Sequence, residues 1–381
     1  MGARTVGLVA IVGLLCLVPA PPAHADTAAC SEDLTGILDR VSTRTLAPGV
    51  ELTVWAGSRS ADDPTADAVR AAVVRSSGGF AGLRPILGLP RRQDPAAMLD
   101  GAGPLAAVNG DLFSSVALDA TVPTGPVVID GTVLYAPPAR RPVVHWSADR
   151  PRVHRSLLRA SVTFAMPAGR SAVPIAAVNH PSLQSGPVLF LSPWSGRTTR
   201  GAVTVVLRKG RVADVIRPGR AVTVEGNSLV LQVPDASGLP VGLRPGVRAQ
   251  VASRLGRTGG DTSAIGHGGR LLRDGRVTRD CEIPGSLLRP RTALAWNDEG
   301  DSWLAVITNG LDDPPSGMRV GGAAVTAFGR WLASLGATDA VLMDGGGSTI
   351  MLRDTPAGPR RVDLPASTYR RPVPVLVGIV G

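Results

Sequence analysis

The chain has 381 residues, of which 44% are apolar, 18% charged and only 3% aromatic. This composition, with 46 glycines and 33 prolines, lies in the range of globular domains and excludes a disordered or fibrous protein. The formal net charge is +10, but the arginines are scattered and few aromatic side chains are present to stack on bases. No nucleic-acid partner is therefore expected.

Residues 1–25 have the pattern of an export signal. Arg4 supplies the positive end, residues 6–18 the apolar core, and Ala23-His24-Ala25 a cleavage site. After this stretch, no apolar run is long enough to cross a bilayer. The sequence therefore predicts a secreted, extracellular protein without a membrane span.

Two cysteines remain after such a cleavage, Cys30 and Cys281. In an oxidising compartment they are expected to form one disulfide that ties the N-terminal segment, residues 26–49, to the body of the protein. Two unpaired, buried cysteines are the alternative.

Short runs of branched apolar residues, bounded by glycine, proline, asparagine or aspartate, predict strands along most of the chain. They lie at residues 50–55, 105–108, 127–129, 143–146, 161–165, 188–191 and 203–207. The pattern is weaker near residues 229–233, where the alternation is brief.

Two helices are predicted. Asp94 followed by Pro95 has the pattern of an N-cap and first turn, which indicates a short helix before the strand at 105–108. Apolar residues at 325, 328, 332 and 335 form one helical face, and Gly336 is placed to end that helix. In the same part of the chain, residues 292–296 and 303–307 predict a hairpin, and residues 340–343 and 349–352 predict two strands.

Several familiar catalytic signatures are missing: the Gly-x-Ser-x-Gly elbow, the His-Glu-x-x-His pair and a phosphate loop ending in Gly-Lys. The histidines after the signal also lack metal-ligand spacing, which disfavours zinc and serine-hydrolase chemistry. What remains is a set of polar residues where predicted strands begin or end. They are Asn109, Gly110 and Asp111 after the strand at 105–108, Arg291 and Thr292 at the start of the hairpin, and Asp344 and Ser348 after the strand at 340–343.

Three glycines, Gly345, Gly346 and Gly347, separate Asp344 from Ser348. Such a run costs backbone entropy and offers no side chains for packing. It therefore indicates positive φ angles or a ligand that approaches the main chain closely. A plain tight turn is the alternative.

The order and separation of these blocks resemble the phosphodiester glycosidase family. This is the family of the lysosomal "uncovering enzyme", which removes N-acetylglucosamine from the phosphodiester-linked cap on mannose phosphate. The blocks that carry the resemblance are residues 107–113, 264–266, 271–275, 290–293 and 335–348.

Asn179-His180-Pro181 and residues 201–209 extend the likeness over most of residues 50–381. The resemblance implies one phosphodiester glycosidase-like domain over residues 50–381, with a sheet-rich α+β fold and few helices. The β-rich middle section, at about residues 150–255, is either a small separate domain or an elaboration of one sheet.

Two positions depart from the family pattern. Arg289 stands where histidine usually precedes Pro-Arg-Thr, and Asn309-Gly310-Leu311 stands where the family usually has Asp-Gly-Arg. The second departure removes a carboxylate and a guanidinium, which predicts a changed substrate or a loss of activity. Nearby charged residues that could replace them are Asp312, Asp313 and Arg319.

The required chemistry assigns roles to the remaining residues. Breaking the bond between an anomeric carbon and a phosphate oxygen develops positive charge on the sugar, so the site needs a carboxylate, for which Asp344 is the first candidate. The leaving phosphate needs cations and hydrogen-bond donors instead of a strong acid. The candidate donors are the Arg291 guanidinium, the amides of Gly345, Gly346 and Gly347, and the Ser348 hydroxyl.

Asp111 or Asn109 would position the sugar or a water, and Gly110, Thr292 and Asn309 complete the expected substrate-binding set. The alternative for Arg291 is a surface salt bridge. For Asp111 it is a turn cap that satisfies its own loop.

The sequence thus predicts a secreted hydrolase that releases a sugar from a sugar-1-phosphodiester in a cell-wall or exported glycan. A non-catalytic glycan- or wall-binding protein on the same scaffold is the main alternative, because of Leu311. A nuclease or phosphodiesterase attacking phosphorus would need metal-ligating carboxylates, for which Asp312 and Asp313 are the only hint. No cofactor is expected, a divalent metal is left open, and neither the sugar nor the oligomeric state is predicted.

Overall fold

The computed structural model describes residues 30–62, 68–116, 118–147, 150–256, 262–278, 288–309, 321–364 and 370–381. This part of the chain is mostly β, with two α-helices, α2 (Pro95–Ala102) and α3 (Val325–Ser334), and two short 3-10 helices, η1 (Ala236–Gly238) and η2 (Gly346–Ser348). The expectation of a sheet-rich fold with few helices is confirmed, although helix contributes less than the α+β class suggests. Within the described ranges, no helix combines the length and apolarity needed to cross a membrane.

The largest sheet has eight strands in the order β1-β2-β3-β24-β23-β25-β21-β22. Their bounds are β1 Asp39–Ala47, β2 Val50–Ser58, β3 Ala68–Ser76, β24 Ser302–Thr308, β23 Arg291–Trp296, β25 Asp339–Leu342, β21 Gly269–Arg273 and β22 Arg276–Val277. The predicted hairpin is confirmed as β23 and β24, which pair antiparallel from Arg291↔Ile307 to Trp296↔Ser302.

A second sheet contains the C-terminal strand and has the order β27-β26-β5-β28-β4. Its strands are β27 Arg360–Arg361, β26 Met351–Arg353, β5 Ala106–Asn109, β28 Val375–Ile379 and β4 Leu83–Leu87. The third sheet has the order β11-β10-β20-β8-β9 and comprises β11 Arg152–Ser156, β10 Arg141–Trp146, β20 Ser263–Gly266, β8 Val127–Ile129 and β9 Thr132–Tyr135. A two-stranded ribbon, β6 Phe113–Ser115 with β7 Thr121–Pro123, follows β5.

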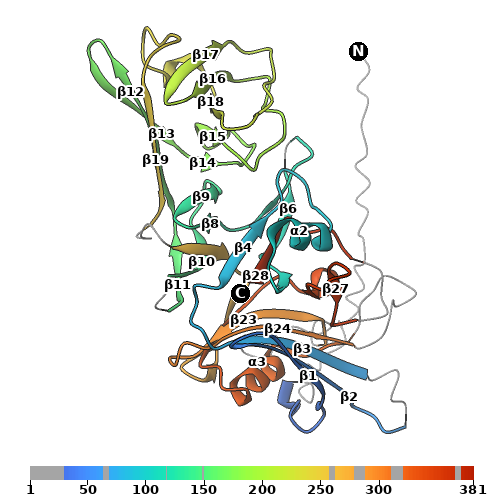
Figure 1. The fold of residues 1–381 in the computed structure, drawn as a ribbon. Helices are drawn as coiled ribbons and strands as arrows, with labels where there is room; N and C mark the ends of the chain where they lie inside the picture. Colours follow the sequence, from blue (N-terminus) through green and yellow to red (C-terminus); the bar gives the residue numbers. More distant parts are fainter. Residues whose placement is uncertain are drawn as a thin grey trace, which may run out of the picture.

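The middle section forms two further sheets at the end of the molecule opposite to α3 (Figure 1). One contains β13 Gly169–Ile175, β12 Leu158–Met166 and β19 Ala249–Leu255, and the other β14 Ala177–Val178, β15 Val188–Phe190, β18 Leu229–Val233, β16 Val203–Arg208 and β17 Arg211–Ile216. Residues 229–233, where the sequence pattern was weak, are therefore a strand.

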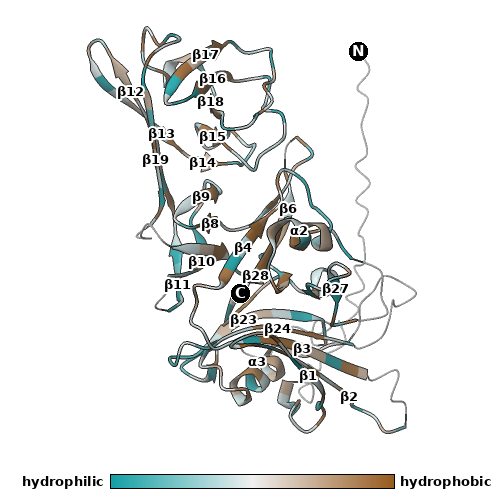
Figure 2. Ribbon diagram, in the orientation of Figure 1, coloured by the Kyte–Doolittle hydropathy of each residue, from teal (hydrophilic) through white to brown (hydrophobic). Residues whose placement is uncertain are grey.

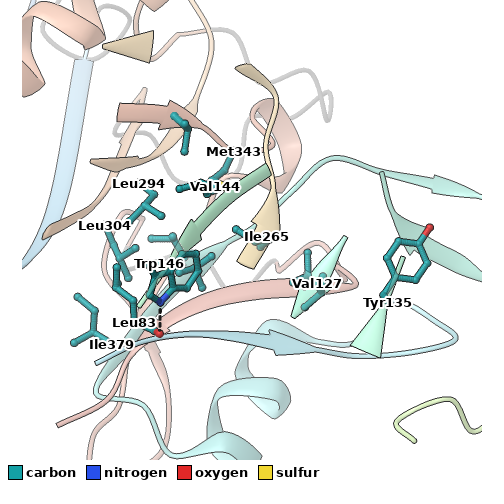
Figure 3. Packing of buried hydrophobic residues seen from close by; sticks show 14 of the residues in the cluster. Leu83, Val127, Tyr135, Val144, Trp146, Ile265, Leu294, Leu304, Met343 and Ile379 are labelled. Carbon is teal, nitrogen blue, oxygen red and sulfur yellow. Dashed lines mark hydrogen bonds between the residues drawn. The ribbon is translucent and has the colours of Figure 1, made fainter. Parts of the chain in front are cut away.

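One central apolar core lies between the three main sheets. Because side chains alternate along a strand, Val74 and Val306 of the largest sheet face this core, while Val73 and Ala305 face a second cluster that α3 covers. Figure 3 shows part of the central core around Trp146, whose Nε1 donates a hydrogen bond to Leu83 O at 2.8 Å.

The other two sheets also bury both faces. The second sheet packs Leu352 and Leu376 against α2 in a small cluster. The third sheet turns Val143 and Ala264 toward the middle section, in one cluster with Val162 and Val205. Hydrophilic residues collect in edge strands such as β11 and β27, as Figure 2 shows.

Both predicted helices form for the reasons read from the sequence. The Asp94 carboxylate accepts hydrogen bonds from Ala96 N at 2.8 Å and Ala97 N at 3.2 Å, which satisfies two free amides at the start of α2. On α3, Phe328 and Leu332 are fully buried, and the chain leaves the helix through Gly336 at φ +97°.

Candidate active site

The ends of β5 and β25 are joined through the side chain of Asn109, which is 1% exposed. Its Nδ2 donates to the carbonyl oxygen of Asp344 at 2.7 Å. Its Oδ1 accepts from Thr292 Oγ1 at 2.7 Å and from Ile350 N at 3.2 Å. Asn109 and Thr292, both predicted to bind substrate, thus bond each other and hold the loop that carries Asp344.

Backbone contacts bring the Asn-Gly-Asp and Asp-Gly-Gly-Gly-Ser segments together. Asp344 N donates to Gly110 O, and Gly110 N donates to Val375 O, both at 2.9 Å. A Cβ at Gly110 would lie 2.7 Å from Cδ1 of Ile265 and 3.1 Å from Cγ1 of Val375, so a larger residue here would force these side chains to move. Met343, the residue before Asp344, packs in the central core near Val144 (Figure 3) and fixes the end of β25.

Asp344 is half-buried and lies two residues after the end of β25. Its Oδ1 accepts from Gly345 N at 2.9 Å, and its carboxylate also accepts a hydrogen bond from Ser348. Burial raises the pKa of Asp344, while the hydrogen bonds from Ser348 and Gly345 and the positive charge of Arg371 act in the opposite direction.

Arg371 completes this group, since its Nη1 donates to Ser348 Oγ at 3.2 Å. Its guanidinium also lies over the ring of Phe113, 5.2 Å from the centroid. One hydroxyl therefore connects a guanidinium to a carboxylate. Sequence reasoning missed Arg371, whose only signal was its place in a pair with Arg370.

Asp111, the residue after Gly110, is only 3% exposed. Its Oδ2 accepts from Gly125 N at 2.5 Å, and a Cβ at Gly266 would lie 2.3 Å from the same oxygen. Burial raises the pKa of Asp111 to about 7, and the negative charge of Asp344 adds to the rise, while hydrogen bonds from Gly125 and Leu112 act against it. The charge of Asp344 thus reaches Asp111, and both carboxyl groups have raised pKa values.

Two residues of the third sheet, Tyr135 and Arg141, interact electrostatically with Asp111, and His180 of the middle section lies beside Tyr135. Tyr135 ends β9 and is fully buried, and the charge of Asp111 adds to the burial that raises its pKa. Its ring centroid lies 6.1 Å from that of His180, whose pKa burial lowers, and the charge of Arg141 lowers it further. The Asn-His-Pro block quoted for the resemblance thus places a neutral imidazole beside this tyrosine.

Arg291 lies on a different side of β23 from Thr292. By alternation it shares the face of Ala293, which belongs to the cluster under α3, and its Nε donates to Ala323 O at 3.2 Å. The described contacts bring Arg371 close to the Asp344 carboxylate.

The fold itself accounts for two of the three glycines. Gly346 has φ +57°, and a Cβ at Gly345 would lie 2.9 Å from Pro290 O. The amide of Gly345 donates to Asp344 Oδ1, and that of Gly346 donates to Pro290 O at 2.9 Å. These two amides are thus used within the protein and not as the free phosphate donors expected from the sequence. A Cβ at Gly347 would meet only the Arg371 side chain, with Nη1 at 3.4 Å and Cδ at 3.7 Å.

Other predicted residues are only partly described. Asn309 is buried after β24, and Arg289 makes a backbone bridge with Ala323. Cys30 is disulfide-bonded, but Cys281 lies outside the described residues, so its pairing stays a prediction. Also outside them are Gly310, Leu311, Asp312, Asp313 and Arg319. Within the described ranges, no three acidic, histidine or cysteine side chains form a group that could hold a metal.

Residues 200–380 match the model of the family described as phosphodiester glycosidase. The resemblance read from the sequence is thereby confirmed for this part of the chain. The match includes Thr292, Asp344, Ser348 and Arg371, whereas Asn109 and Asp111 precede it. No curated protein matches the chain.

Solved structures share the fold at low sequence identity. A hypothetical protein from Synechocystis superposes with a TM-score of 0.64 at 18% identity. The match covers 89% of this chain but only 63% of that protein's length. A Burkholderia pseudomallei protein named "Putative exported protein" gives 0.66 at 19% identity, covering 90% of this chain and 97% of that one. The catalytic domain of zebrafish N-acetylglucosamine-1-phosphodiester alpha-N-acetylglucosaminidase, auto-inhibited by its pro-peptide, gives 0.42 at 13% identity over 94% of each chain, a score that does not establish a shared fold.

Proposed function

We propose that this chain, which carries a phosphodiester glycosidase domain over residues 200–380, hydrolyses the bond between a sugar and the phosphate of a sugar-1-phosphodiester. The observation that carries the proposal is the connected group Arg371, Ser348 and Asp344, in which a guanidinium and a carboxylate bond the same hydroxyl. The family description supplies the reaction class, and this group supplies the two charges that the reaction needs.

The two charges match the two sides of the bond that breaks. As the bond weakens, positive charge develops on the sugar ring, and a nearby carboxylate stabilises it or attacks the anomeric carbon. Asp344 takes this role. The phosphate leaves with negative charge, which a fixed guanidinium stabilises through charge-assisted hydrogen bonds. Arg371 takes this role.

Asp111 influences the ionisation of Asp344 through its own charge. With a pKa of about 7, Asp111 is protonated in a large fraction of molecules near neutral pH. While Asp111 is neutral, Asp344 has no second negative charge beside it and ionises more readily. Asp111 therefore positions and tunes the site, and its burial keeps it from direct contact with a sugar.

We also propose that the enzyme acts outside the cell on a phosphate-bearing glycan of the wall or an exported polymer. Two observations support this location: the export-signal pattern of residues 1–25, and the name of the Burkholderia protein, which refers to export.

Release of free sugar from a panel of sugar-1-phosphodiesters tests the proposal. Asp344→Asn should lower release by about 100-fold or more, because it removes the charge that the transition state needs. Asp354→Asn is the matched control, since Asp354 is exposed ten residues later and only its backbone amide makes a described bond. Equal release by wild type and Asp344→Asn would refute the assignment.

The binding-protein alternative rests on Asn309-Gly310-Leu311, where the resemblance predicts an acid and an arginine. It predicts no release from any substrate in the panel together with measurable binding to wall glycans. That pair of results would replace the hydrolase proposal.

A further inference from the structure

A cavity of about 600 Å³ lies where the middle section meets the body of the protein. Its lining comes from three segments that are far apart in sequence: residues 89–91 and 93 before α2, residues 118–119 between β6 and β7, and residues 194–197 between β15 and β16. The segments pack closely. Thr121 N donates to Pro90 O at 2.8 Å, and a Cβ at Gly196 would lie 2.9 Å from Cγ of Pro90. The assembled fold therefore defines this cavity, and the middle section supplies one of its walls.

The cavity lies next to the candidate active site. The guanidinium groups of Arg371 and Arg92 both lie over the ring of Phe113, at 5.2 Å and 5.9 Å from its centroid. The two chain neighbours of Arg92 both line the cavity. Gln93 and Val373 also exchange backbone hydrogen bonds at 3.0 Å, so the segment that ends at Gln93 runs beside the segment that begins at Arg371. The guanidinium that bonds Ser348 and the cavity are thus connected through one aromatic ring.

Guanidinium groups continue from Arg371 into the cavity. Arg92 is the first of them, and Arg91 and Arg197 belong to the cavity lining. Arg91 and Arg197 come from different segments of the chain, so it is the fold that brings their charges to one cavity. The fork of a guanidinium matches the oxygens of a phosphate and forms charge-assisted hydrogen bonds with them. This arrangement fits a ligand with an acidic group beyond the phosphate at Arg371.

The remaining lining suits a sugar. The Gln93 amide can donate to and accept from hydroxyl groups, and the Asp119 carboxylate can accept from them. Leu89, Leu118 and Trp194 add apolar surface, against which the C–H groups of a sugar ring can pack. An apolar lining with a few polar groups, in a cavity of this volume, is typical of small-ligand sites.

We propose that this cavity binds a sugar unit of the substrate that lies on the phosphate side of the bond to be broken and carries a further phosphate. The inference rests on the proposed function, in which Arg371 binds the phosphate that leaves. Because the cavity adjoins Arg371 through Phe113 and Arg92, the unit bound there belongs to the leaving group and not to the released sugar. The substrate is therefore a chain with phosphates on successive units.

Two substrates with the same released sugar and the same scissile bond test the inference. In one the leaving group is methyl phosphate, and in the other it is a phosphate attached to a sugar that carries a second phosphate. The wild type should have a kcat/KM about tenfold or more higher for the second substrate, because two further charge-assisted contacts form. In Arg91→Gln/Arg197→Gln, the ratio of the two kcat/KM values should fall toward one. An equal kcat/KM for both substrates in the wild type, or an unchanged ratio in the variant, would overturn the inference.

The matched control is Arg159→Gln/Arg254→Gln. Arg159 and Arg254 are exposed on β12 and β19, and neither lines this cavity. This variant has the same change of net charge and should keep the wild-type ratio, so an equal fall in both double variants would argue against a specific site. Arg91 and Arg197 are exposed as well, so Arg91→Gln/Arg197→Gln should unfold at the wild-type temperature.

A binding measurement separates this inference from the proposed hydrolysis. Titration calorimetry of the full chain compares a maltodextrin that carries 6-phosphate groups with the same maltodextrin without phosphate, neither of which contains a sugar-1-phosphodiester. The wild type should bind the phosphorylated form about tenfold or more tightly than the plain form, and Arg91→Gln/Arg197→Gln should remove most of this difference.

The two proposals fail in different ways. Preferential binding of the phosphorylated maltodextrin that depends on Arg91 and Arg197, without sugar release from any phosphodiester, would refute the hydrolase and support the cavity as a site for phosphorylated sugars. Sugar release together with equal affinity for the two maltodextrins would support the hydrolase and overturn the assignment of the cavity.

Discussion

Replacing Asn109 with alanine removes three hydrogen bonds at once from a side chain that is 1% exposed. The lost partners are Asp344 O, Thr292 Oγ1 and Ile350 N. Thr292 and Ile350 are themselves buried, so water does not replace the lost acceptor. Each buried donor left without a partner costs about 1–3 kcal/mol. The two donors together should lower the free energy of unfolding by about 2–6 kcal/mol.

Thr292→Val is the matched comparison for this change. It removes one donor, but Asn109 Oδ1 keeps its bond from Ile350 N at 3.2 Å, so the expected cost is only about 1 kcal/mol. Urea denaturation of both variants at pH 7, followed by tryptophan fluorescence, measures the difference. If Asn109→Ala costs no more than Thr292→Val, Asn109 does not hold the site together in the way described.

Two further predictions concern the acid pair and its loop. The pKa of Asp111 is about 7 in the folded protein, against an ordinary value of 3.8. The folded state therefore binds this proton more tightly than the unfolded state does. As a result, the free energy of unfolding should fall as the pH rises from about 4 to about 7. Asp111→Asn should flatten this fall in urea denaturation across that range, and equal slopes for both proteins would contradict the raised pKa. In the loop, Gly346→Ala should cost about 1 kcal/mol from its positive φ alone, because its Cβ would meet nothing within 4 Å. Gly345→Ala should cost more, since its Cβ would lie 2.9 Å from Pro290 O, and equal unfolding temperatures for the two variants would argue against that close contact.

Local signals in the sequence predicted the elements that depend on local physics. Asp94 and Pro95 start α2 because capping and the fixed φ of proline act within one turn. The hairpin of β23 and β24 follows from two apolar runs and the polar turn between them. The position of Asp344 at the end of β25 could be predicted for the same reason.

Contacts between distant segments could not be predicted in this way. Arg371 reaches Ser348 across 23 positions, and no motif surrounds it. The face on which Arg291 lies depends on which side of the sheet α3 covers, and this is a property of the assembled fold. The raised pKa of Asp111 likewise arises from burial between Gly125 and Gly266, which are far apart in sequence.

The third sheet has a consequence for how far the middle section could be exchanged or shortened. The chain leaves this sheet after β11 and returns to it at β20, and both strands pair with β10. A shorter connection between them would therefore leave the register of β10 unchanged. Val143 and Ala264, however, rest against the middle section, so a chain without it would present a fresh apolar surface to water and be prone to self-association. Any substitute for this section would have to connect β11 to β20 and also cover Val143 and Ala264 with apolar side chains.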